Sequence, residues 1–136
     1  MNRSSARELS FKLLYEIEIQ KDTSDEHIQL FIENQDITDE KAITYIKDVA
    51  KGVTEKMDEI VNFISNNLKE EWELSRVSKI NIALLKLAIY ELIEKQLPYK
   101  VVINEAIELA KKYGDDNSPS FVNGILASIV KKQNLS

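Results

Sequence analysis

The longest apolar stretch of the chain spans residues 80–93 and predicts a helix that is buried on most of its sides. A helix that is apolar around most of its circumference must be covered by other elements. The stretch has only 14 residues, whereas a membrane span takes about 20, and Lys86 and Glu91 interrupt it. We therefore expect a central core helix within residues 75–97 and no membrane segment. Its apolar residues form two sides: Ile80, Leu84, Leu87 and Ala88, and then Ile82, Leu85, Ile89 and Leu92.

Amphipathic segments before and after this stretch predict the helices that cover it. The composition, with three Gly and two Pro among 136 residues, also favours helices over a sheet. We expect an all-α, single-domain bundle of about seven helices over residues 1–136. The other helices are expected to begin at Ser4 or Ser5, at Thr23, near Asp39, near Lys100 and at Ser118. Residues 39–68 form one long helix or two nearly collinear ones.

Local signals place the ends of these helices. Gly52 marks either a kink or a close helix–helix contact, and Pro98 stops the central helix because proline disfavours helical geometry in the preceding residue. Residues 69–74 are expected to connect two helices, with Trp72 and Leu74 tucked onto the core. The expected caps are Ser5 with Glu8 in a capping box, Thr38, Ser75, Gly114 as a C′ glycine, and Ser118 followed by Pro119.

The first helix carries two apolar stripes on nearly opposite sides. A terminal helix needs only one buried face, so the second stripe needs a covering element. Another helix of the same domain is one possibility, and a partner protein is the other. The first stripe consists of Ala6, Leu9, Leu13 and Ile17, and the second of Phe11, Tyr15 and Ile19.

Composition excludes several classes of function. The absence of cysteine rules out disulfides and thiolate metal sites. The single histidine, His27, rules out multi-histidine sites and is expected to be exposed on a short helix. The first ten residues lack the apolar core of a signal peptide, which makes a cytoplasmic location the default expectation.

The net charge of −5 is unevenly distributed. Residues 1–12 carry three basic and one acidic side chain, whereas residues 13–60 carry five basic and thirteen acidic ones. Residues 61–136 are nearly balanced, with ten basic and nine acidic side chains. The total charge alone argues against a nucleic-acid partner, but the acidity is confined to one part of the chain and the N-terminal arm is basic.

Catalytic and cofactor-binding patterns are missing from the sequence. It contains no Gly-rich phosphate loop, no nucleophile elbow and no metal-ligand spacing. The acidic residues at 70, 71 and 73 are explained by a solvated connection. Asn104 and Glu105 are expected to be partly buried and bonded to loop backbone. We therefore expect a protein that is not an enzyme and needs no cofactor.

Modest signals for RNA binding are spread along the chain. Basic residues occur in the first helix, at the start of the central helix and at the end of the following one. Aromatic residues flank a polar turn whose amide groups suit unpaired bases. Each feature alone is equally typical of an ordinary surface. The residues concerned are Arg3, Arg7, Arg76, Lys112, Tyr113, Asn117, Ser118 and Phe121.

Several sequence blocks together resemble the NusB family of transcription antitermination factors. The most specific are PYKVVINEAIELAKKYG (98–114) and SFVNGILASIV (120–130). SARELSFKLLYE (5–16), DVAKGV (48–53) and LLKLAIYEL (84–92) support them in the same order. The N-terminal domain of certain RNA cytosine-5 methyltransferases shares this module, but no catalytic domain follows residue 136 here, which favours the free-standing factor.

This resemblance implies two packed helical subbundles and a specific set of partners. The family binds the boxA element of nascent ribosomal RNA transcripts as a heterodimer with the small-subunit ribosomal protein NusE, and so helps RNA polymerase read through terminators. Carried onto this chain, Arg3 and Arg7 of the N-terminal arm and Asn117, Ser118 and Phe121 of the loop form the RNA surface. The partner-binding tyrosine of the family corresponds to Tyr15, in the second stripe with Phe11 and Ile19.

The N-terminal arm departs from the family pattern. It is short and carries only Arg3 and Arg7, where many members hold a longer arginine cluster. Fewer phosphate contacts weaken RNA binding and reduce its salt dependence. The sequence leaves open the RNA affinity without the protein partner, the preferred RNA sequence, and whether the free chain forms a homodimer.

Overall fold

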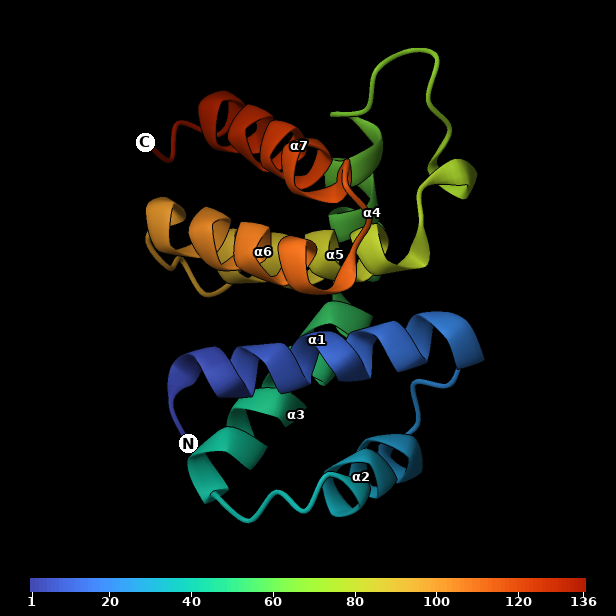
Figure 1. The fold of residues 1–136 in the computed structure, drawn as a ribbon, viewed down its shortest axis with the longest axis vertical. Coiled ribbons are helices and arrows are strands. Elements are labelled where there is room, and N and C mark those ends of the chain that lie inside the picture. The colour runs from blue at the N-terminus through green and yellow to red at the C-terminus, as the bar shows by residue number, and fades with distance from the viewer.

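Seven α-helices and one short 3₁₀ helix make up the structure, a computed structural model that describes residues 1–136 (Figure 1). The all-α class and the number of helices are as predicted. No helix is both long enough and apolar enough to cross a membrane. The helices are α1 (Arg3–Gln20), α2 (Asp25–Asn34), α3 (Glu40–Glu55), α4 (Met57–Ser65), η1 (Leu74–Arg76), α5 (Lys79–Ile93), α6 (Tyr99–Tyr113) and α7 (Ser118–Lys132).

The helices form two subbundles, each with its own apolar core. Figure 1 shows α1, α2 and α3 in one half and α4 to α7 in the other. Leu13, Phe31 and Ile46 belong to the smaller core, between α1, α2 and α3. Phe11 and Leu14 of α1 instead join the larger core around α5. Helix α1 therefore contributes to both cores and holds the two halves together.

The central helix of the sequence prediction is α5, and residues 81–92 are all buried. Its N-cap differs from the prediction: the Ser78 side chain accepts the Asn81 backbone N–H, whereas Ser75 lies in the preceding 3₁₀ turn. The helix ends at Ile93, so it is not Pro98 that stops it as predicted. The backbone N–H of Leu97 donates to the Glu91 carbonyl in the chain reversal that follows.

Residues 39–68 form two helices, α3 and α4, that break at Lys56. Gly52 lies within α3, so it marks a close contact and not the break. A Cβ atom at this position would overlap the ring and hydroxyl of Tyr90 on α5. Glycine therefore allows α3 to approach the central helix closely.

The two charged residues that interrupt the central helix are buried and paired. Glu91 is 1% exposed and accepts from the Nε of Arg7 at 2.8 Å, with Arg7 also 1% exposed. The Tyr45 hydroxyl on α3 donates to the same carboxylate. Burial and the negative charge of Glu91 both raise the pKa of Tyr45, which keeps its proton on the hydroxyl. These contacts connect α1, α3 and α5 through one carboxylate.

A second ion pair joins α1 and α5 further along their length. The Nζ of Lys86 lies 2.6 Å from the Glu18 carboxylate, and the Lys86 side chain is only 9% exposed. Although burial raises the pKa of Glu18, the hydrogen bond and charge of Lys86 outweigh that effect and leave it lowered. The two buried charged residues of α5, Lys86 and Glu91, thus face α1 and have partners there.

Three of the N-terminal caps lie one or more residues from their predicted positions. The side chains that accept the first-turn N–H groups are Asn2 for α1, Ser24 for α2 and Asp39 for α3. The predicted Ser5, Thr23 and Thr38 are near neighbours of similar chemistry. Local composition indicated where each helix begins, but several adjacent side chains could serve as the cap.

Gly114 ends α6 for a reason other than left-handed geometry. Its backbone is extended, with φ −89° and ψ −170°, so the predicted C′ glycine conformation is wrong. A Cβ atom here would overlap the Ser118 side chain. The tight α6–α7 turn therefore requires glycine at this position because a side chain would not fit.

His27 is buried, at 7% exposed, and the prediction of an exposed histidine is wrong. Its Nδ1 lies 2.6 Å from the Asp22 carbonyl oxygen and its Nε2 lies 3.1 Å from Glu16 Oε1. Burial lowers the pKa of His27, but these hydrogen bonds outweigh it and raise the pKa. The ring thus joins the start of α2 to α1.

We expect Glu91→Ala to lower the free energy of unfolding by about 3–5 kcal/mol, because the buried charge of Arg7 would lose its closest partner. Chemical denaturation followed by circular dichroism measures this. The matched control is Glu94→Ala, an exposed position on the same turn, where the change should stay within about 0.5 kcal/mol. Equal stabilities of the two variants would contradict the structural role of the pair.

Candidate nucleic-acid interface

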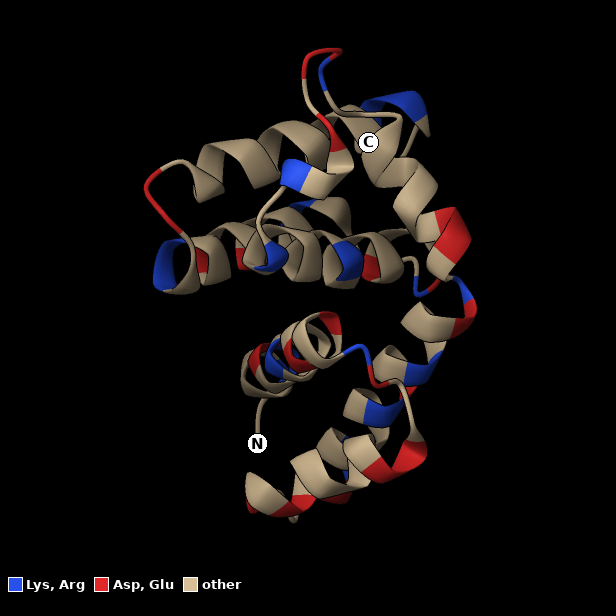
Figure 2. Ribbon diagram, turned by 90° about the vertical axis from the view of Figure 1, so that its right-hand side faces the viewer, with Lys and Arg blue, Asp and Glu red and all other residues tan.

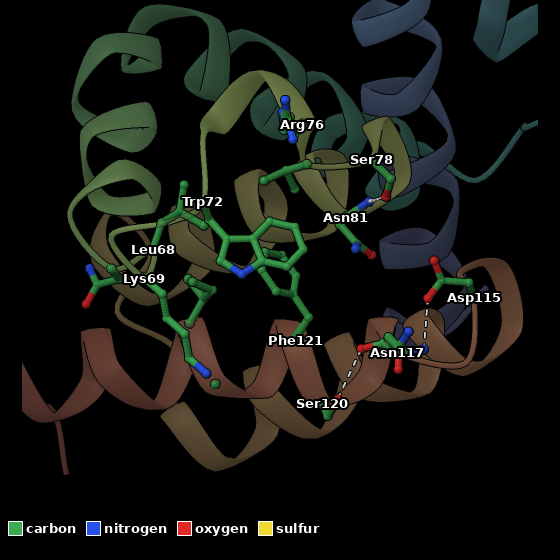
Figure 3. Close-up of a pocket in the computed structure, with 14 residues that line it drawn as sticks. Leu68, Lys69, Trp72, Arg76, Ser78, Asn81, Asp115, Asn117, Ser120 and Phe121 are labelled. Carbon is green, nitrogen blue, oxygen red and sulfur yellow. Dashed lines mark hydrogen bonds between the residues drawn. The ribbon is translucent and has the colours of Figure 1, made fainter.

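A groove of about 580 Å³ opens between the connection after α4, the start of α5 and the α6–α7 turn (Figure 3). It contains three of the predicted RNA-binding residues, namely Arg76, Asn117 and Phe121. Trp72 and Asn81, which were not predicted as site residues, also line it. The groove therefore combines aromatic rings, the two cations Lys69 and Arg76, and amide groups from segments that are distant in the sequence.

The aromatic part of the groove is formed by Trp72 and Phe121. Their ring centroids are 5.9 Å apart and the ring planes are tilted by 42°. Trp72 is 46% exposed, so the prediction that it is tucked onto the core is wrong. Phe121 is half-buried and packs against the larger core while its ring also borders the groove. Open ring faces of this kind are suited to stacking with unpaired bases.

The turn before α7 is held by its own polar side chains. The Ser118 hydroxyl accepts the Asp115 backbone N–H at 3.0 Å, and Asp115 Oδ1 accepts the Asn117 N–H at 2.8 Å. Ser118 is only 1% exposed, so its side chain shapes the turn and is not open to a ligand. The predicted N-cap role of Ser118 is also wrong, since its hydroxyl bonds within the turn. Asn117 is exposed at the edge of the groove.

The predicted basic residues differ in how free they are to bind phosphate. Arg76 is exposed and forms no ion pair. Lys112 is exposed, but its Nζ lies 2.6 Å from the Glu8 carboxylate, which also accepts from the Tyr113 hydroxyl. The hydrogen bond to Glu8 raises the pKa of Lys112 and the same contact lowers the pKa of Glu8. Lys112 therefore already has an anionic partner.

Arg3 and Arg7 do not share an exposed edge of α1. Arg3 is exposed in the first turn, whereas Arg7 is buried on Glu91 and lies 3.5 Å from Glu105. The prediction that Arg7 can reach RNA phosphates is therefore wrong. Glu105 bonds to side chains, including the Ser4 hydroxyl at 2.8 Å, and not to loop backbone as predicted. Asn104 is exposed, contrary to its prediction.

The second apolar stripe of α1 is buried at one end and open at the other. Phe11 is 2% exposed and lies 5.1 Å from the Tyr113 ring, so its prediction as a partner contact is wrong. Tyr15 is half-buried and Ile19 is 48% exposed. A hollow of about 270 Å³ beside Tyr15 is bordered by Phe31 of α2 and by Ile80 of α5, among others.

Basic and acidic residues alternate along the helices and are not separated into different parts of the ribbon (Figure 2). The acidic residues at 70, 71 and 73 are exposed beside Trp72, as predicted for a solvated connection. No group of three or more His, Asp or Glu side chains is arranged to hold a metal ion. The groove can bind a flat, partly polar ligand, but it contains no arrangement of nucleophile and base.

Asn81 and Trp72 are the groove residues that sequence reasoning missed. Asn81 is the only uncharged polar side chain in the buried part of α5, apart from the Tyr90 hydroxyl. A polar amide at a position predicted to be buried was the signal that could have singled it out. Trp72 gave no such signal, because an aromatic residue in a connection is equally suited to core packing.

Comparison with known proteins gives a consistent result over nearly the whole chain. Residues 4–131 match the NusB family. The transcription antitermination protein NusB of Acetivibrio thermocellus is 44% identical over 137 residues, covering 100% of this chain and 93% of that protein. The corresponding protein of Clostridium novyi is 42% identical over 133 residues, covering 96% and 99%.

Solved structures agree with the sequence comparison. The T. maritima NusB structure has a TM-score of 0.82 and 39% identity, covering 97% of this chain and 92% of that one. A crystal structure of the antitermination factors NusB and NusE in complex with double-stranded RNA contains a chain with a TM-score of 0.87 and 27% identity, covering 96% of both chains.

The helical fold and these matches define a non-catalytic, RNA-binding transcription factor. The chain belongs to the NusB family of transcription antitermination factors. The prediction that it is not an enzyme follows from this membership.

Proposed function

We propose that this chain binds boxA-type RNA of nascent ribosomal RNA transcripts in the groove that Trp72 and Phe121 border. It acts there as a heterodimer with the ribosomal protein NusE and promotes read-through by RNA polymerase. The observation that carries the proposal is the pair of rings 5.9 Å apart beside the unpaired Arg76. A related NusB chain has been solved together with NusE and double-stranded RNA, which supports NusE and RNA as the two classes of partner.

Unpaired RNA suits this groove better than a duplex does. Bases in a duplex are stacked on each other, whereas bases in a single strand are free to stack on Trp72 or Phe121. Asn117 at the edge of the groove offers an amide to a base edge or to a sugar. Arg76, on the opposite side of the groove from that turn, can neutralise a phosphate.

The charges of the chain favour RNA binding that depends on a protein partner. Of the predicted cations, Arg3 and Arg76 are exposed, Lys112 is paired with Glu8, and Arg7 is buried. Only two of these four predicted cations are free, and the net charge of −5 gives the chain as a whole little electrostatic attraction for a polyanion. A basic ribosomal protein bound alongside would supply the missing positive charge.

The second stripe of α1 is the proposed surface for that protein. Tyr15 is half-buried beside a hollow that can accept a side chain, and Ile19 of the same stripe is exposed. This surface belongs to residues 13–60, where acidic side chains outnumber basic ones by thirteen to five. An aromatic anchor in an acidic surround suits a basic protein partner.

A module that serves an RNA methyltransferase is the alternative function. The relatives matched over almost their full length are antitermination proteins, which favours the first proposal. A transcription assay with purified RNA polymerase and a terminator downstream of boxA separates the two. Read-through should increase when this chain and NusE are added together, and no increase would defeat the antitermination proposal.

Phe121→Ala and Phe121→Leu test the groove. Loss of the stacking ring should weaken binding of single-stranded boxA RNA by about 1–3 kcal/mol in both variants. Leu keeps the apolar packing against the core, so Phe121→Leu should retain most of the stability. The only tryptophan, Trp72, allows the titration to be followed by fluorescence. Unchanged affinity of a folded Phe121→Leu protein would place the bases elsewhere.

Arg3→Ala and Arg76→Ala should each reduce the slope of log K against log salt concentration by about 0.7, the contribution of one phosphate contact with a single strand. Lys131→Ala is the control, because Lys131 is exposed at the far end of α7. A filter-binding series in increasing salt gives these slopes. If Arg3→Ala and Arg76→Ala keep the wild-type slope, the phosphates contact another surface.

Tyr15→Asp should abolish the heterodimer while leaving a folded protein, because a charge would replace the aromatic anchor at a half-buried position. The matched control is Val101→Asp, at an exposed apolar residue on α6. Calorimetric titration with NusE and thermal melts measure both effects. A Tyr15→Asp protein that is unfolded, or that still binds NusE, would contradict the proposed surface.

A further inference from the structure

Asn81 carries a nearly buried side-chain amide that makes no hydrogen bond within the protein. The residue lies in the first turn of α5 and is 8% exposed. Only its backbone N–H is bonded, to the Ser78 hydroxyl at 3.1 Å. Its Oδ1 atom is buried without any partner. Buried polar groups are almost always hydrogen-bonded, so this exception requires an explanation.

The groove is where the amide of Asn81 can find a partner. Asn81 is one of its lining residues, and Figure 3 shows its side chain directed from α5 toward the turn that holds Asn117. The other polar side chains nearby are already engaged: Ser118 bonds to Asp115, and the Ser120 hydroxyl donates to the Asn117 carbonyl. The Asn81 amide is thus the one buried polar group in the groove that is left free.

We propose that the Asn81 amide reads the edge of one unpaired RNA base held against Phe121 and Trp72. A carboxamide presents a donor and an acceptor side by side, as do the hydrogen-bonding edges of nucleobases. Rotation about its last torsion, which is broad for asparagine, presents Oδ1 to the base. This inference rests on the proposed RNA-binding function and assigns the selection of the base to one residue of the groove. The rings hold any base, because stacking tolerates all four, whereas Asn81 discriminates between them.

A purely structural role for Asn81 makes the opposite prediction about stability. An amide that helps to hold the fold would have partners, and its removal would destabilise the protein. An amide that serves a ligand leaves an unsatisfied buried acceptor in the free protein, which lowers the stability of the fold. Replacing it with an apolar side chain of similar size removes this destabilisation. The sign of the stability change therefore separates the two roles.

The experiment compares wild-type protein with Asn81→Leu in thermal melts and in titrations with single-stranded boxA RNA. The RNA set carries each of the four bases in turn at every position, and NusE is present throughout. We expect Asn81→Leu to melt at the same temperature as wild type or higher. We also expect it to bind boxA RNA about 10-fold more weakly and to lose the base preference at one position. Asn123→Leu, at an exposed position of α7 outside the groove, is the control and should leave both properties unchanged.

Two results would overturn the inference. One is an Asn81→Leu protein with unchanged RNA affinity and base preference, and the other is one that is destabilised while its base preference is kept. Failure of the proposed function is recognised separately, because wild-type protein with NusE would then not bind boxA RNA at all.

Discussion

The buried contact of Arg7 with Glu91 is the interaction on which the arrangement of the two subbundles depends. It joins α1 to the central helix α5, and the Tyr45 hydroxyl adds α3 to the same carboxylate. Buried ion pairs add little net stability compared with apolar packing, but they penalise every arrangement in which one charge loses its partner. The contact thus specifies how the subbundle of α1, α2 and α3 sits on the subbundle of α4 to α7.

Both proposed binding surfaces take their positions from this contact. Helix α1 is held on α5 at Arg7 and again through Glu18 and Lys86, so its direction along the central helix is defined at two points. Arg3 then lies at one end of α1, and Tyr15 and Ile19 lie beyond the middle. The groove uses the first turn of the same central helix, where Asn81 lies. A rotation of α1 about α5 would move the proposed RNA and protein surfaces relative to each other.

Much of the fold could be predicted from the sequence, because periodicity reports burial directly. The central helix, the seven helices and the double stripe of α1 all follow from the spacing of apolar residues. Arg7 and His27 were misplaced for the opposite reason: charged and polar residues are normally exposed, and their burial depends on partners that are distant in sequence. Glu91 is 84 residues from Arg7, and no local pattern joins them.

The candidate site was only partly predictable for the same reason. Arg76, Asn117 and Phe121 were identified, and the structure brings them to one groove. Ser118 was identified for its residue type, although its hydroxyl is used inside the turn. Asn81 and Trp72 were missed because their exposure to the groove depends on how the connection after α4 lies against α7. Tertiary packing, which single-sequence patterns do not contain, decides this.

An NMR titration with boxA RNA of isotope-labelled protein already bound to unlabelled NusE tests the central claim most directly, because it maps the RNA surface residue by residue. The account predicts that backbone amide shifts concentrate at residues 72–81 and 114–124, with the side-chain amide of Asn81 among them. Shifts centred on Tyr15 and Ile19, with none around Trp72 and Phe121, would contradict it.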